Sequence, residues 1–306
     1  MKQKVIIIGG GEIVTHYKEG LEASPIFEVV GLCDVDEQCP ARAIFPNLPF
    51  YTDYTTAIEE LKPNGVIIAV PTELHGVIAM ACLKQGMDVY LEKPIATTIK
   101  SIKFLCVAAN KYNKRLVPLF HWRYADEVMF LERYLAGKEV THASVYIRDD
   151  YACEPRGKIR FDRRGLCGAW LDSGINALSY LNQICTFESV TLTDKVEYVD
   201  KTCDLPYFSM RRFNTGLNRE IEIIVNWSTN SRKKESRIIA NGEEIFVDHT
   251  EQTVWTEKGI LFHKKVEDRL SAHYVNMFAS KELLEDSLVY EGEYLHDVLF
   301  LEDGSL

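Results

Sequence analysis

The sequence lacks a long apolar run, an excess of basic residues and paired cysteine motifs. Its 306 residues carry a formal net charge of −10, which argues against nucleic acid as a partner, because a nucleic-acid-binding domain needs a basic face. No segment approaches the roughly 18 consecutive apolar residues of a membrane span. The apolar run that ends at Ile8 reaches glycine too soon for a signal peptide. We therefore expect a cytoplasmic protein that has no membrane partner.

The eight cysteines show no Cys-x-x-Cys pair, and no histidines stand at zinc-finger spacing. A structural zinc site is therefore not expected, and we predict no metal. Reduced and mostly buried thiols are favoured over disulfides. The chain length predicts two domains, since one domain averages ~150 residues.

A strand, a glycine turn and a helix open the chain. Residues 4–8 form an apolar, β-branched run, three glycines follow at once, and a helix is expected from Glu12 to about Glu22. This order lets a pyrophosphate bind backbone N–H groups at the helix N-terminus. The third position of the usual G-x-G-x-x-G motif is Val14 and departs from that motif. The residues expected to contact a dinucleotide here are Gly9, Gly11, Glu12 and Ile13.

A second expected strand, Phe27–Cys33, leads to Asp34, which lies 23 residues after Gly11. An acidic residue about 20 residues beyond such a turn hydrogen-bonds the ribose 2′-hydroxyl. The next residue is Val35 and not the arginine that often receives a 2′-phosphate, so NAD is favoured as cofactor and NADP is possible. The alternative is that Asp34 only shapes a turn.

Strands and helices continue to alternate as far as Phe120. The pattern predicts an α/β domain, namely a Rossmann doubly wound parallel sheet, over residues 1–122. Ligands of such sheets bind along the carboxyl ends of the strands. Further strands are expected at 65–70, 88–91 and 115–120, and further helices at 54–61, 73–85 and 98–112. Residues that lie at or near such strand ends, and that we expect to contact the cofactor, are Val70, Pro71, Thr72, His75, Glu92 and Lys93.

Lys93 is the most informative of these residues. It follows an apolar run in the tripeptide Glu92-Lys93-Pro94. A lysine with little water around it needs a partner for its charge, and the proline disfavours helical backbone at Lys93. We therefore expect Lys93 at the nicotinamide end of the cofactor. The alternative is a surface lysine at a strand end.

After His121 the pattern predicts an α+β domain over residues 123–306. Strands dominate this half, and they are expected to form a large, mostly antiparallel open sheet with helices on one side. Asn241-Gly242 predicts a hairpin turn between two of the strands. We expect a homo-oligomer, a dimer or a tetramer, through the remaining face of this sheet. Strands are expected at 140–147, 190–199, 207–212, 221–227, 235–241, 244–247, 253–256 and 260–263, and helices at 126–135, 267–285 and 293–301.

A helix that begins near Asp172 would place Asp172 and Asn176 on one face. In the alternative, Asp172 is an N-cap and Asn176 is a buried partner for nearby backbone. A two-domain dehydrogenase needs polar groups from its second domain that face the nicotinamide. We therefore expect both residues in a catalytic site with Lys93.

Gly9-x-Gly11, Val70-Pro71-Thr72 with His75, Glu92-Lys93-Pro94 and Asp172-x-Gly174 together resemble the glucose/fructose oxidoreductase and inositol dehydrogenase family (Gfo/Idh/MocA). The resemblance covers nearly the whole chain. It implies that Lys93 is a substrate and catalytic contact near the nicotinamide. The second-domain motif of that family is Asp-x-Gly-x-His, in which the histidine is the acid/base. Here the last position is Asn176, and an amide does not exchange a proton at neutral pH.

The variant Asp-x-Gly-Ile-Asn-Ala-Leu-Ser is similar to a narrower group, the aldose 1-dehydrogenases that act on L-arabinose and D-galactose. That resemblance implies a sugar substrate contacted by His121, Asp149 and Trp227. Asp149 stands where the group has a glutamate, and the segment from Tyr151 to Phe161 departs from the group. For His121 the alternative is a satisfied histidine near the sheet rim.

These residue types predict an NAD(P)-dependent dehydrogenase that acts on CH–OH groups. Hydride would leave C1 of a pyranose for C4 of the nicotinamide, and the O1 proton would go to Asp172, so that the product is a lactone. Lys93 would hydrogen-bond O1 or a neighbouring hydroxyl, and Asn176 would hold O1 in line. The alternatives are oxidation of another cyclic polyol or sugar derivative, and a non-catalytic dinucleotide-dependent sensor of the same fold.

Overall fold

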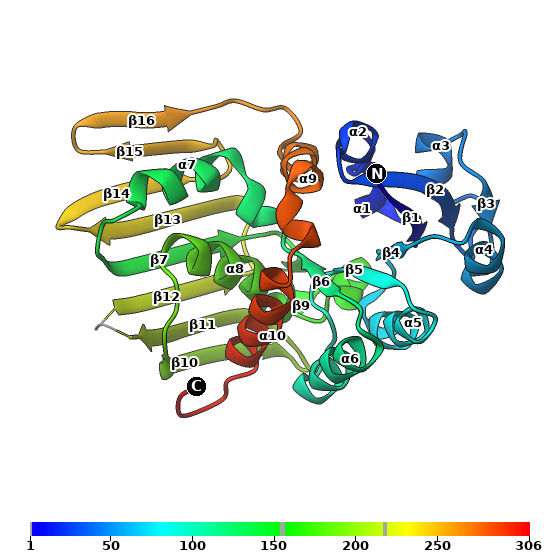
Figure 1. Ribbon diagram of the computed structural model, residues 1–306. Coiled ribbons are helices and arrows are strands. Elements are labelled where there is room, and N and C mark those ends of the chain that lie inside the picture. Colours follow the sequence, from blue (N-terminus) through cyan, green and yellow to red (C-terminus); the bar gives the residue numbers. More distant parts are fainter. Residues whose placement is uncertain (1, 154–156, 217–218) are drawn as a thin grey trace. The chain divides into compact units, whose positions relative to one another are not determined.

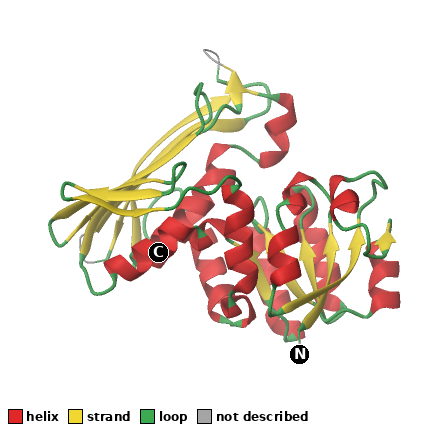
Figure 2. Cartoon of the chain, turned by 90° about the horizontal axis from the view of Figure 1, so that it is seen from above, coloured by secondary structure: helices red, strands yellow, loops and turns green. Residues whose placement is uncertain are grey.

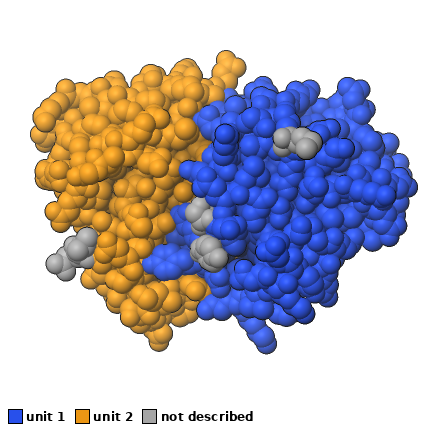
Figure 3. Space-filling model, viewed as in Figure 1, with its two compact units in different colours: residues 1–121, 268–296 blue, residues 122–267, 297–306 orange. Residues whose placement is uncertain are grey.

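The computed structural model describes residues 2–153, 157–216 and 219–306, and contacts divide the chain into two compact units (Figure 3). Unit 1 comprises residues 1–121 and 268–296, and unit 2 comprises residues 122–267 and 297–306. Contacts therefore group residues 268–296 with the N-terminal sheet. The division into folding domains at 1–122 and 123–306 stays a prediction.

Unit 1 is built on a six-stranded parallel sheet with the order β3-β2-β1-β4-β5-β6 (Figures 1 and 2). Its central strands are apolar, and nearly all of their residues are buried, as expected when helices cover both faces of a sheet. The order runs outward from β1 in both directions, which confirms the predicted doubly wound α/β fold. The strands are β1 (Gln3–Ile8), β2 (Phe27–Cys33), β3 (Phe50–Tyr51), β4 (Gly65–Ile68), β5 (Asp88–Glu92) and β6 (Leu116–Leu119).

The helical stretch predicted from Glu12 to about Glu22 is present, but it is divided into two short helices. Backbone bonds from the N–H groups of Val14, His16 and Tyr17 each reach the carbonyl three residues earlier, which tightens the chain at Tyr17 and ends the first helix. The break leaves Tyr17 fully buried. The helices of unit 1 are α1 (Glu12–Thr15), α2 (Lys18–Ala23), α3 (Pro40–Ile44), α4 (Tyr54–Leu61), α5 (Thr72–Lys84), α6 (Ile99–Tyr112), α9 (Arg269–Ala279) and α10 (Ser287–Leu299).

The C-terminal helices also differ from their predicted bounds. The helix predicted at 267–285 ends at Ala279, because Ser280 is extended and caps a separate 3-10 turn. Helix α10 begins before the predicted residue 293. It packs closely on β6, since a Cβ added to Gly292 would lie 2.7 Å from Pro118 Cγ. A glycine at this point therefore lets α10 approach the sheet.

Unit 2 is built on an eight-stranded sheet with the order β10-β11-β12-β7-β13-β14-β15-β16. All neighbours pair antiparallel except β7 and β12, so the prediction of a mostly antiparallel sheet is confirmed. Helices α7 (Asp126–Leu135) and α8 (Ile175–Ile184) lie on one face of this sheet (Figures 1 and 2). The strands are β7 (Val140–Arg148), β10 (Val190–Asp200), β11 (Leu205–Thr215), β12 (Arg219–Asn226), β13 (Lys233–Ala240), β14 (Glu243–Asp248), β15 (Thr253–Thr256) and β16 (Gly259–His263).

Two local features of this sheet bear on the sequence predictions. The predicted Asn241-Gly242 hairpin joins β13 to β14, and both residues have positive φ, +49° and +77°, as a tight hairpin turn requires. A small extra pair of strands, β8 (Ala152–Cys153) and β9 (Lys158–Ile159), was not predicted. Residues 154–156, between β8 and β9, lie outside the described residues.

A buried polar chain ties α8 to the sheet of unit 2. Glu127 Oε1 lies 2.9 Å from His249 Nδ1, His249 Nε2 lies 2.8 Å from Ser236 Oγ, and Ser236 Oγ lies 2.5 Å from the Tyr180 hydroxyl. These four side chains are between 0% and 6% exposed, so each buried polar group has a partner. Tyr180 lies one turn after Asn176 on α8, and the chain therefore fixes the helix that carries Asn176.

Within the described ranges, no helix combines the length and the apolar character needed to cross a membrane. Nor does the described part of the chain gather three or more His, Cys, Asp or Glu side chains in a way that could hold a metal ion. The cysteines whose side chains are described are free thiols, and the side chain of Cys153 lies outside that set.

Candidate functional site

The glycine turn after β1 has a closed base and an open face. Gly9 has a φ of +99°, and an added Cβ would lie 2.4 Å from the carbonyl oxygen of Ala69, so glycine is required there. A Cβ on Gly11 would meet nothing within 4 Å. Gly11 precedes α1, whose first N–H groups have no partner inside the helix. The turn therefore fits a pyrophosphate that accepts hydrogen bonds from these N–H groups.

Asp34, the expected ribose ligand, lies beside this turn. Its Oδ2 accepts a hydrogen bond from the Gly10 N–H at 2.5 Å, and its Oδ1 accepts one from the Asp36 N–H at 2.8 Å. The side chain of Val35 is 90% exposed, so the position next to the carboxylate is apolar and open. The structure thus brings Asp34 and the glycine turn together, as a dinucleotide site requires.

The carboxylate of Glu92 anchors the loop that carries Lys93. Glu92 is 6% exposed, and its Oε1 accepts hydrogen bonds from the hydroxyls of Tyr17 at 2.5 Å and Tyr274 at 2.6 Å. Its Oε2 accepts the Lys93 N–H at 3.2 Å. Burial, followed by the charge of Glu92, raises the pKa of both tyrosines well above the usual range, so both hydroxyls keep their protons and donate. Glu92 therefore positions its neighbour Lys93.

His75 joins the loop after β4 to the loop after β5. Its Nδ1 lies 2.8 Å from the Pro94 carbonyl oxygen, and its Nε2 lies 2.9 Å from that of Val70. Burial lowers the pKa of His75, although the two carbonyls and the charge of Glu92 act in the opposite direction. The side chain is 1% exposed, so His75 is packed between Val70 and Pro94, and the neutral ring donates to one of the two carbonyls.

His296 of α10 holds the same loop from another side. Its Nε2 accepts a hydrogen bond from the Ile95 N–H at 3.1 Å, and its Nδ1 lies 2.6 Å from the carbonyl oxygen of Gly292. Burial lowers the pKa of His296 to about 4. The neutral ring therefore donates through Nδ1 and accepts through Nε2. Sequence reasoning missed His296, because its partners at the sheet edge are 201 residues away.

His121 follows strand β6, which pairs with β5, the strand that precedes Lys93. In the β5–β6 pair Glu92 stands opposite Leu119, so Lys93 and His121 follow neighbouring strand ends. The Nδ1 atoms of His121 and His273 are 3.2 Å apart, and the two rings stack with an angle of 22°. The contact with His273 favours the alternative that His121 is a satisfied histidine at the sheet rim. The sugar contact of His121 stays a prediction.

Helical backbone begins at Ala169, three residues before the predicted start near Asp172. A π-helical turn, Trp170–Gly174, precedes α8, and the Asp172 N–H donates to the Gly168 carbonyl at 3.1 Å. Asp172 thus lies inside helical backbone and is not an N-cap. The wide turn has a packing cause, because the ring of Trp170 lies against Gly174, where a Cβ would meet the ring at 2.7 Å. Such turns often occur at functional sites.

Asn176 keeps the position that the spacing predicted. Its Nδ2 lies 3.5 Å from the Asp172 main-chain oxygen, so the two residues lie on the same side of the helix. The side chain is 9% exposed, and its Oδ1 is buried with no hydrogen-bond partner among the described residues. A buried acceptor without a partner is costly, and a hydroxyl of a bound ligand would satisfy it.

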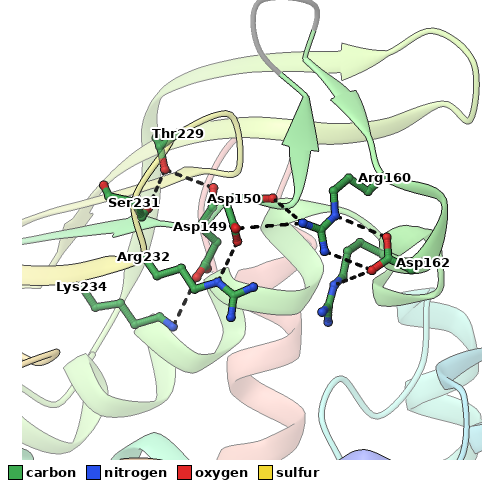
Figure 4. A network of polar contacts seen from close by, with 9 residues as sticks. Asp149, Asp150, Arg160, Asp162, Thr229, Ser231, Arg232 and Lys234 are labelled. Atoms are coloured by element: carbon green, nitrogen blue, oxygen red, sulfur yellow. Dashed lines mark hydrogen bonds and ion pairs between the residues drawn. The ribbon is translucent and has the colours of Figure 1, made fainter.

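Asp149 lies at the end of β7 in the network of Figure 4. Its side chain is 4% exposed, and its Oδ1 lies 3.7 Å from Lys234 Nζ. The hydroxyl of Thr229 donates to the Asp149 carbonyl at 3.1 Å, and the Asp149 N–H donates to that of Asn226 at 2.9 Å. The carboxylate is therefore held on a rigid strand end with a cation beside it.

Trp227 is fully buried, whereas a side chain that packs on a sugar needs an accessible face. The ring of Tyr151 meets the Trp227 ring edge-on at 5.2 Å and 72°. The sugar contact of Trp227 stays a prediction, and Tyr151 is the aromatic residue that lies against it.

Tyr151 was not predicted as a site residue. The guanidinium carbons of Arg163 and Arg232 lie 4.8 Å and 5.5 Å from its ring centre. Burial, followed by the charges of Asp149 and Asp172, raises the pKa of Tyr151 to about 12, so both carboxylates act on its hydroxyl. One signal was available in the sequence, because Tyr151 follows Asp149 by two residues and shares its side of an extended segment.

The predicted residues thus form two sets. Unit 1 holds the glycine turn, Asp34, the Lys93 loop and His121, and unit 2 holds Asp149, Asp172, Asn176 and Trp227. Hydrogen bonds link the glycine turn to Asp34 and Glu92 to the Lys93 loop in unit 1, and Asn176 to the Asp172 main chain in unit 2. That the two sets form one site stays a prediction.

Comparison with known proteins finds relatives of the segment that carries most of the first set. Residues 3–120 match the family model GFO_IDH_MocA, described as "Oxidoreductase family, NAD-binding Rossmann fold". Glycosyl hydrolase family 109 protein 1 of Akkermansia muciniphila is 25% identical over 181 residues, which cover 55% of this chain and 37% of that protein. D-glucoside 3-dehydrogenase of Escherichia coli K12 is 28% identical over 126 residues, which cover 40% of this chain and 36% of that enzyme. The matches thus span less than half of these relatives.

A solved structure resembles the fold over almost the whole chain. The 3-ketoreductase KijD10 of Actinomadura kijaniata, solved with TDP-benzene and NADP, superposes with a TM-score of 0.78 over 98% of this chain and 96% of that one. The sequences are 15% identical, so this likeness concerns the fold alone.

Proposed function

We propose that the chain is a member of the Gfo/Idh/MocA family of oxidoreductases, whose model matches residues 3–120, and that it oxidises a cyclic sugar with NAD as the hydride acceptor. The observation that carries the proposal is the Lys93 loop, which Glu92, His75 and His296 fix at the carboxyl edge of an NAD-binding Rossmann sheet. Several buried contacts to one short loop are expected where a side chain must be positioned within a fraction of an ångström for chemistry. A surface lysine needs none of it.

Cofactor binding is proposed for the residues at this edge of unit 1. The pyrophosphate binds at the turn formed by Gly9 and Gly11 and accepts hydrogen bonds from the Glu12 and Ile13 N–H groups. Asp34 binds the ribose 2′-hydroxyl. A carboxylate at that position repels a 2′-phosphate, so NAD is preferred to NADP. The segment Val70-Pro71-Thr72 lines the same edge. His75 and Glu92 act by holding this segment and the Lys93 loop.

NAD, when bound, supplies the carbon that receives the hydride. The substrate carbon loses a hydride and its hydroxyl loses a proton, which leaves a carbonyl group. We propose that Asp172 takes this proton, that Lys93 hydrogen-bonds the reacting oxygen, and that Asn176 accepts a hydrogen bond from a sugar hydroxyl through its unpartnered Oδ1. His121 and Asp149 are proposed to contact the remainder of the sugar, and the buried Trp227 to support Tyr151, whose ring lies against it.

The position of oxidation has two candidates. Oxidation at C1 of an aldose gives a lactone, and the sequence Asp172-x-Gly-Ile-Asn176 supports it through its likeness to aldose 1-dehydrogenases. Oxidation of a ring hydroxyl gives a ketone, and the name of the relative D-glucoside 3-dehydrogenase favours it. The retained pair Lys93 and Asp172 supports either reaction over a non-catalytic sensor, which has no need for both.

We also propose that copies of the chain associate through the free face of the eight-stranded sheet. Phe246 and Trp255, whose rings stack at 5.7 Å, alternate with buried residues of β14 and β15 and so lie on the face away from α7 and α8. Light scattering of the wild type and of Trp255→Glu tests this proposal. A wild-type protein that is monomeric at micromolar concentration contradicts it. A cytoplasmic location is proposed from the free thiols.

The enzymatic proposal is tested with purified protein, NAD or NADP, and a panel of aldoses, inositols and aryl glycosides. Absorbance of the reduced cofactor reports turnover, and product analysis distinguishes a lactone from a ketone. Release of the aryl group without net cofactor reduction would instead indicate glycoside hydrolysis. Cofactor binding without turnover of any sugar would contradict the enzymatic proposal and favour the sensor.

A further inference from the structure

The ring of Tyr151 has cationic groups from two separate segments against it. Arg163 comes from the 3-10 helix Phe161–Leu166, and Arg232 comes from the loop between β12 and β13. Their guanidinium carbons lie 4.8 Å and 5.5 Å from the ring centre, within the range of cation–π contacts. Two guanidinium groups thus meet one aromatic ring in a chain of net charge −10.

The ion pairs around these arginines leave specific donors available. Arg232 pairs with Asp150 through Nε at 2.7 Å, and Arg163 approaches Asp162 through Nε at 3.3 Å. In the part of the chain that the structure describes, no hydrogen bond involves the terminal Nη nitrogens of Arg163 or Arg232. Two terminal nitrogens of a guanidinium group form a fork that matches a carboxylate or a phosphoryl group.

Arg160, in the same network, bonds through all three of its side-chain nitrogens (Figure 4). Its Nε and Nη2 bind the two oxygens of Asp162 at 3.4 Å and 3.1 Å, and its Nη1 lies 3.5 Å from the Asp150 carbonyl oxygen. Each side-chain nitrogen of Arg160 therefore has an acceptor, two on the Asp162 carboxylate and one on a main-chain carbonyl. Arg163 and Arg232 are only half satisfied by those carboxylates.

Tyr151 connects these two arginines to the proposed sugar contacts. It follows Asp149 by two residues, and its ring lies against Trp227. Burial, followed by the charges of Asp149 and Asp172, raises the pKa of its phenol. An anion bound by the two guanidinium groups would therefore lie next to the sugar.

We propose that Arg163 and Arg232 bind an anionic group of the substrate, so that the enzyme acts on a sugar that carries a carboxylate or a phosphoryl group. This inference rests on the proposed function and narrows its substrate class. Uronic acids, sugar phosphates and nucleoside diphosphate sugars share the required chemistry. A nucleoside diphosphate sugar has a blocked C1 and cannot be oxidised there, whereas a uronic acid or a 6-phosphate still permits lactone formation at C1.

The test compares kcat/KM for D-galactose, D-galacturonate, D-galactose 6-phosphate and UDP-galactose, each with NAD. We expect at least one anionic sugar to exceed galactose by roughly ten- to a hundredfold, which is the range for a hydrogen bond to a charged group. Arg163→Gln and Arg232→Gln are expected to reduce the ratio of anionic to neutral sugar by a similar factor. The preferred anion identifies the source, and the product, lactone or ketone, identifies the position of oxidation.

Arg212→Gln is the matched control, because Arg212 is a 44% exposed arginine whose ion pairs, with Asp194 and Glu222, lie elsewhere on the sheet. It is expected to leave the ratio of anionic to neutral sugar unchanged. Thermal unfolding of all three variants shows whether each is folded. The inference is overturned if galactose is the best substrate, or if folded Arg163→Gln and Arg232→Gln proteins keep the anionic preference.

Calorimetric titration separates this inference from the enzymatic proposal. Binding of D-galacturonate or D-galactose 6-phosphate that is tenfold tighter than that of galactose, and that is lost in Arg232→Gln, supports the anion site even if no sugar is turned over. If neutral sugars are turned over and the charged sugars bind no more tightly than galactose, the dehydrogenase proposal stands and the anion site is refuted. Raised ionic strength is expected to weaken binding of the charged sugars selectively.

Discussion

The imidazole of His296 accepts a hydrogen bond from the main-chain N–H of Ile95 at 3.1 Å, so helix α10 holds the loop that carries Lys93. The other ring nitrogen donates to the Gly292 carbonyl at 2.6 Å. Only the neutral ring has one donor and one acceptor. Protonation of His296 would therefore remove the contact with Ile95.

This arrangement predicts a loss of stability in mild acid. Burial lowers the pKa of His296 from the ordinary 6.5 to about 4, so the unfolded chain binds the extra proton between these two values. The contribution is fully present above pH 6.5 and is lost as the pH falls toward 4, and it amounts to about 3 kcal/mol of the free energy of unfolding. Urea unfolding at a series of pH values measures this loss.

Replacement of His296 by glutamine removes the titrating group and keeps an amide that donates and accepts. We expect His296→Gln to flatten the fall in stability between pH 6.5 and 4. His263→Gln, a change at an exposed histidine, is the control and should leave the pH dependence unchanged. An unaltered slope in His296→Gln would contradict the assignment.

The two tyrosines on Glu92 give a second prediction. Tyr274→Phe removes one of the two hydroxyls that donate to Oε1 and leaves that of Tyr17. A hydrogen bond to a buried charge contributes about 1.5–3 kcal/mol, so the free energy of unfolding should fall by about that amount. The looser loop should also lower kcat more than it weakens NAD binding.

Tyr51→Phe is the matched control for this change, because the Tyr51 hydroxyl donates to Glu60 at 2.9 Å on the exposed surface. That substitution should alter the stability by less than about 1 kcal/mol. Chemical denaturation and steady-state kinetics measure both variants. Equal effects of the two substitutions would argue against a special role for Glu92.

Local patterns in the sequence predicted the elements that are stabilised by local features. Continuous apolar runs predicted the buried parallel strands, and Asn241-Gly242 predicted the hairpin, because the positive φ of both residues is a property of those two residues. Asp172 and Asn176 share a side because four residues make about one helical turn. In each case the cause lies within a few residues.

Contacts between distant segments account for what the sequence did not predict. Tyr274 and Glu92 are 182 residues apart, and no periodicity links them. The π-helical turn arises where the Trp170 ring lies against Gly174, and a helical pattern does not report that approach. Arg163 and Arg232 meet only because both segments reach Tyr151 in the folded unit.

The third prediction concerns the choice of cofactor. Asp34→Ala should weaken NAD binding by roughly ten- to a hundredfold, because a hydrogen bond from the ribose to a charged acceptor is lost. The affinity for NADP should fall less than the affinity for NAD, or should rise, because the substitution relieves repulsion of the 2′-phosphate. Asp36→Ala, a change at the next acidic residue, is the control and should leave the ratio of the two affinities unchanged. Fluorescence titration with each reduced cofactor measures both, and an unaltered ratio in Asp34→Ala would exclude a ribose contact.

Lys93 and Asp172 give the fourth prediction. Lys93→Met keeps the length of the side chain and removes its charge, and Asp172→Asn keeps the shape and removes the base. Each should lower kcat by roughly 10²–10⁴-fold and leave NAD affinity nearly unchanged, since positioned proton-transfer groups contribute in that range. Lys84→Met, at the exposed end of α5, should leave kcat unchanged. Full activity in Asp172→Asn would remove Asp172 from the mechanism.

Substitution of Asn176 is expected to lower activity without lowering stability. Its Oδ1 is buried without a hydrogen-bond partner among the described residues, which costs the folded protein about 1–3 kcal/mol. Asn176→Leu replaces that acceptor with an apolar group of similar size, so the free energy of unfolding should stay equal or rise. Turnover should fall at the same time, because the sugar hydroxyl loses its acceptor.

The neighbouring substitution Ser179→Ala provides the contrast. The Ser179 hydroxyl donates to the Asn176 carbonyl at 2.8 Å and is fully buried, so its removal should destabilise the protein by about 1 kcal/mol and spare the Asn176 side chain. Urea unfolding and kcat/KM for the best sugar distinguish the two variants. A less stable and fully active Asn176→Leu protein would show that the amide serves the fold. A stable and inactive one would show that the unpartnered oxygen is kept for the substrate.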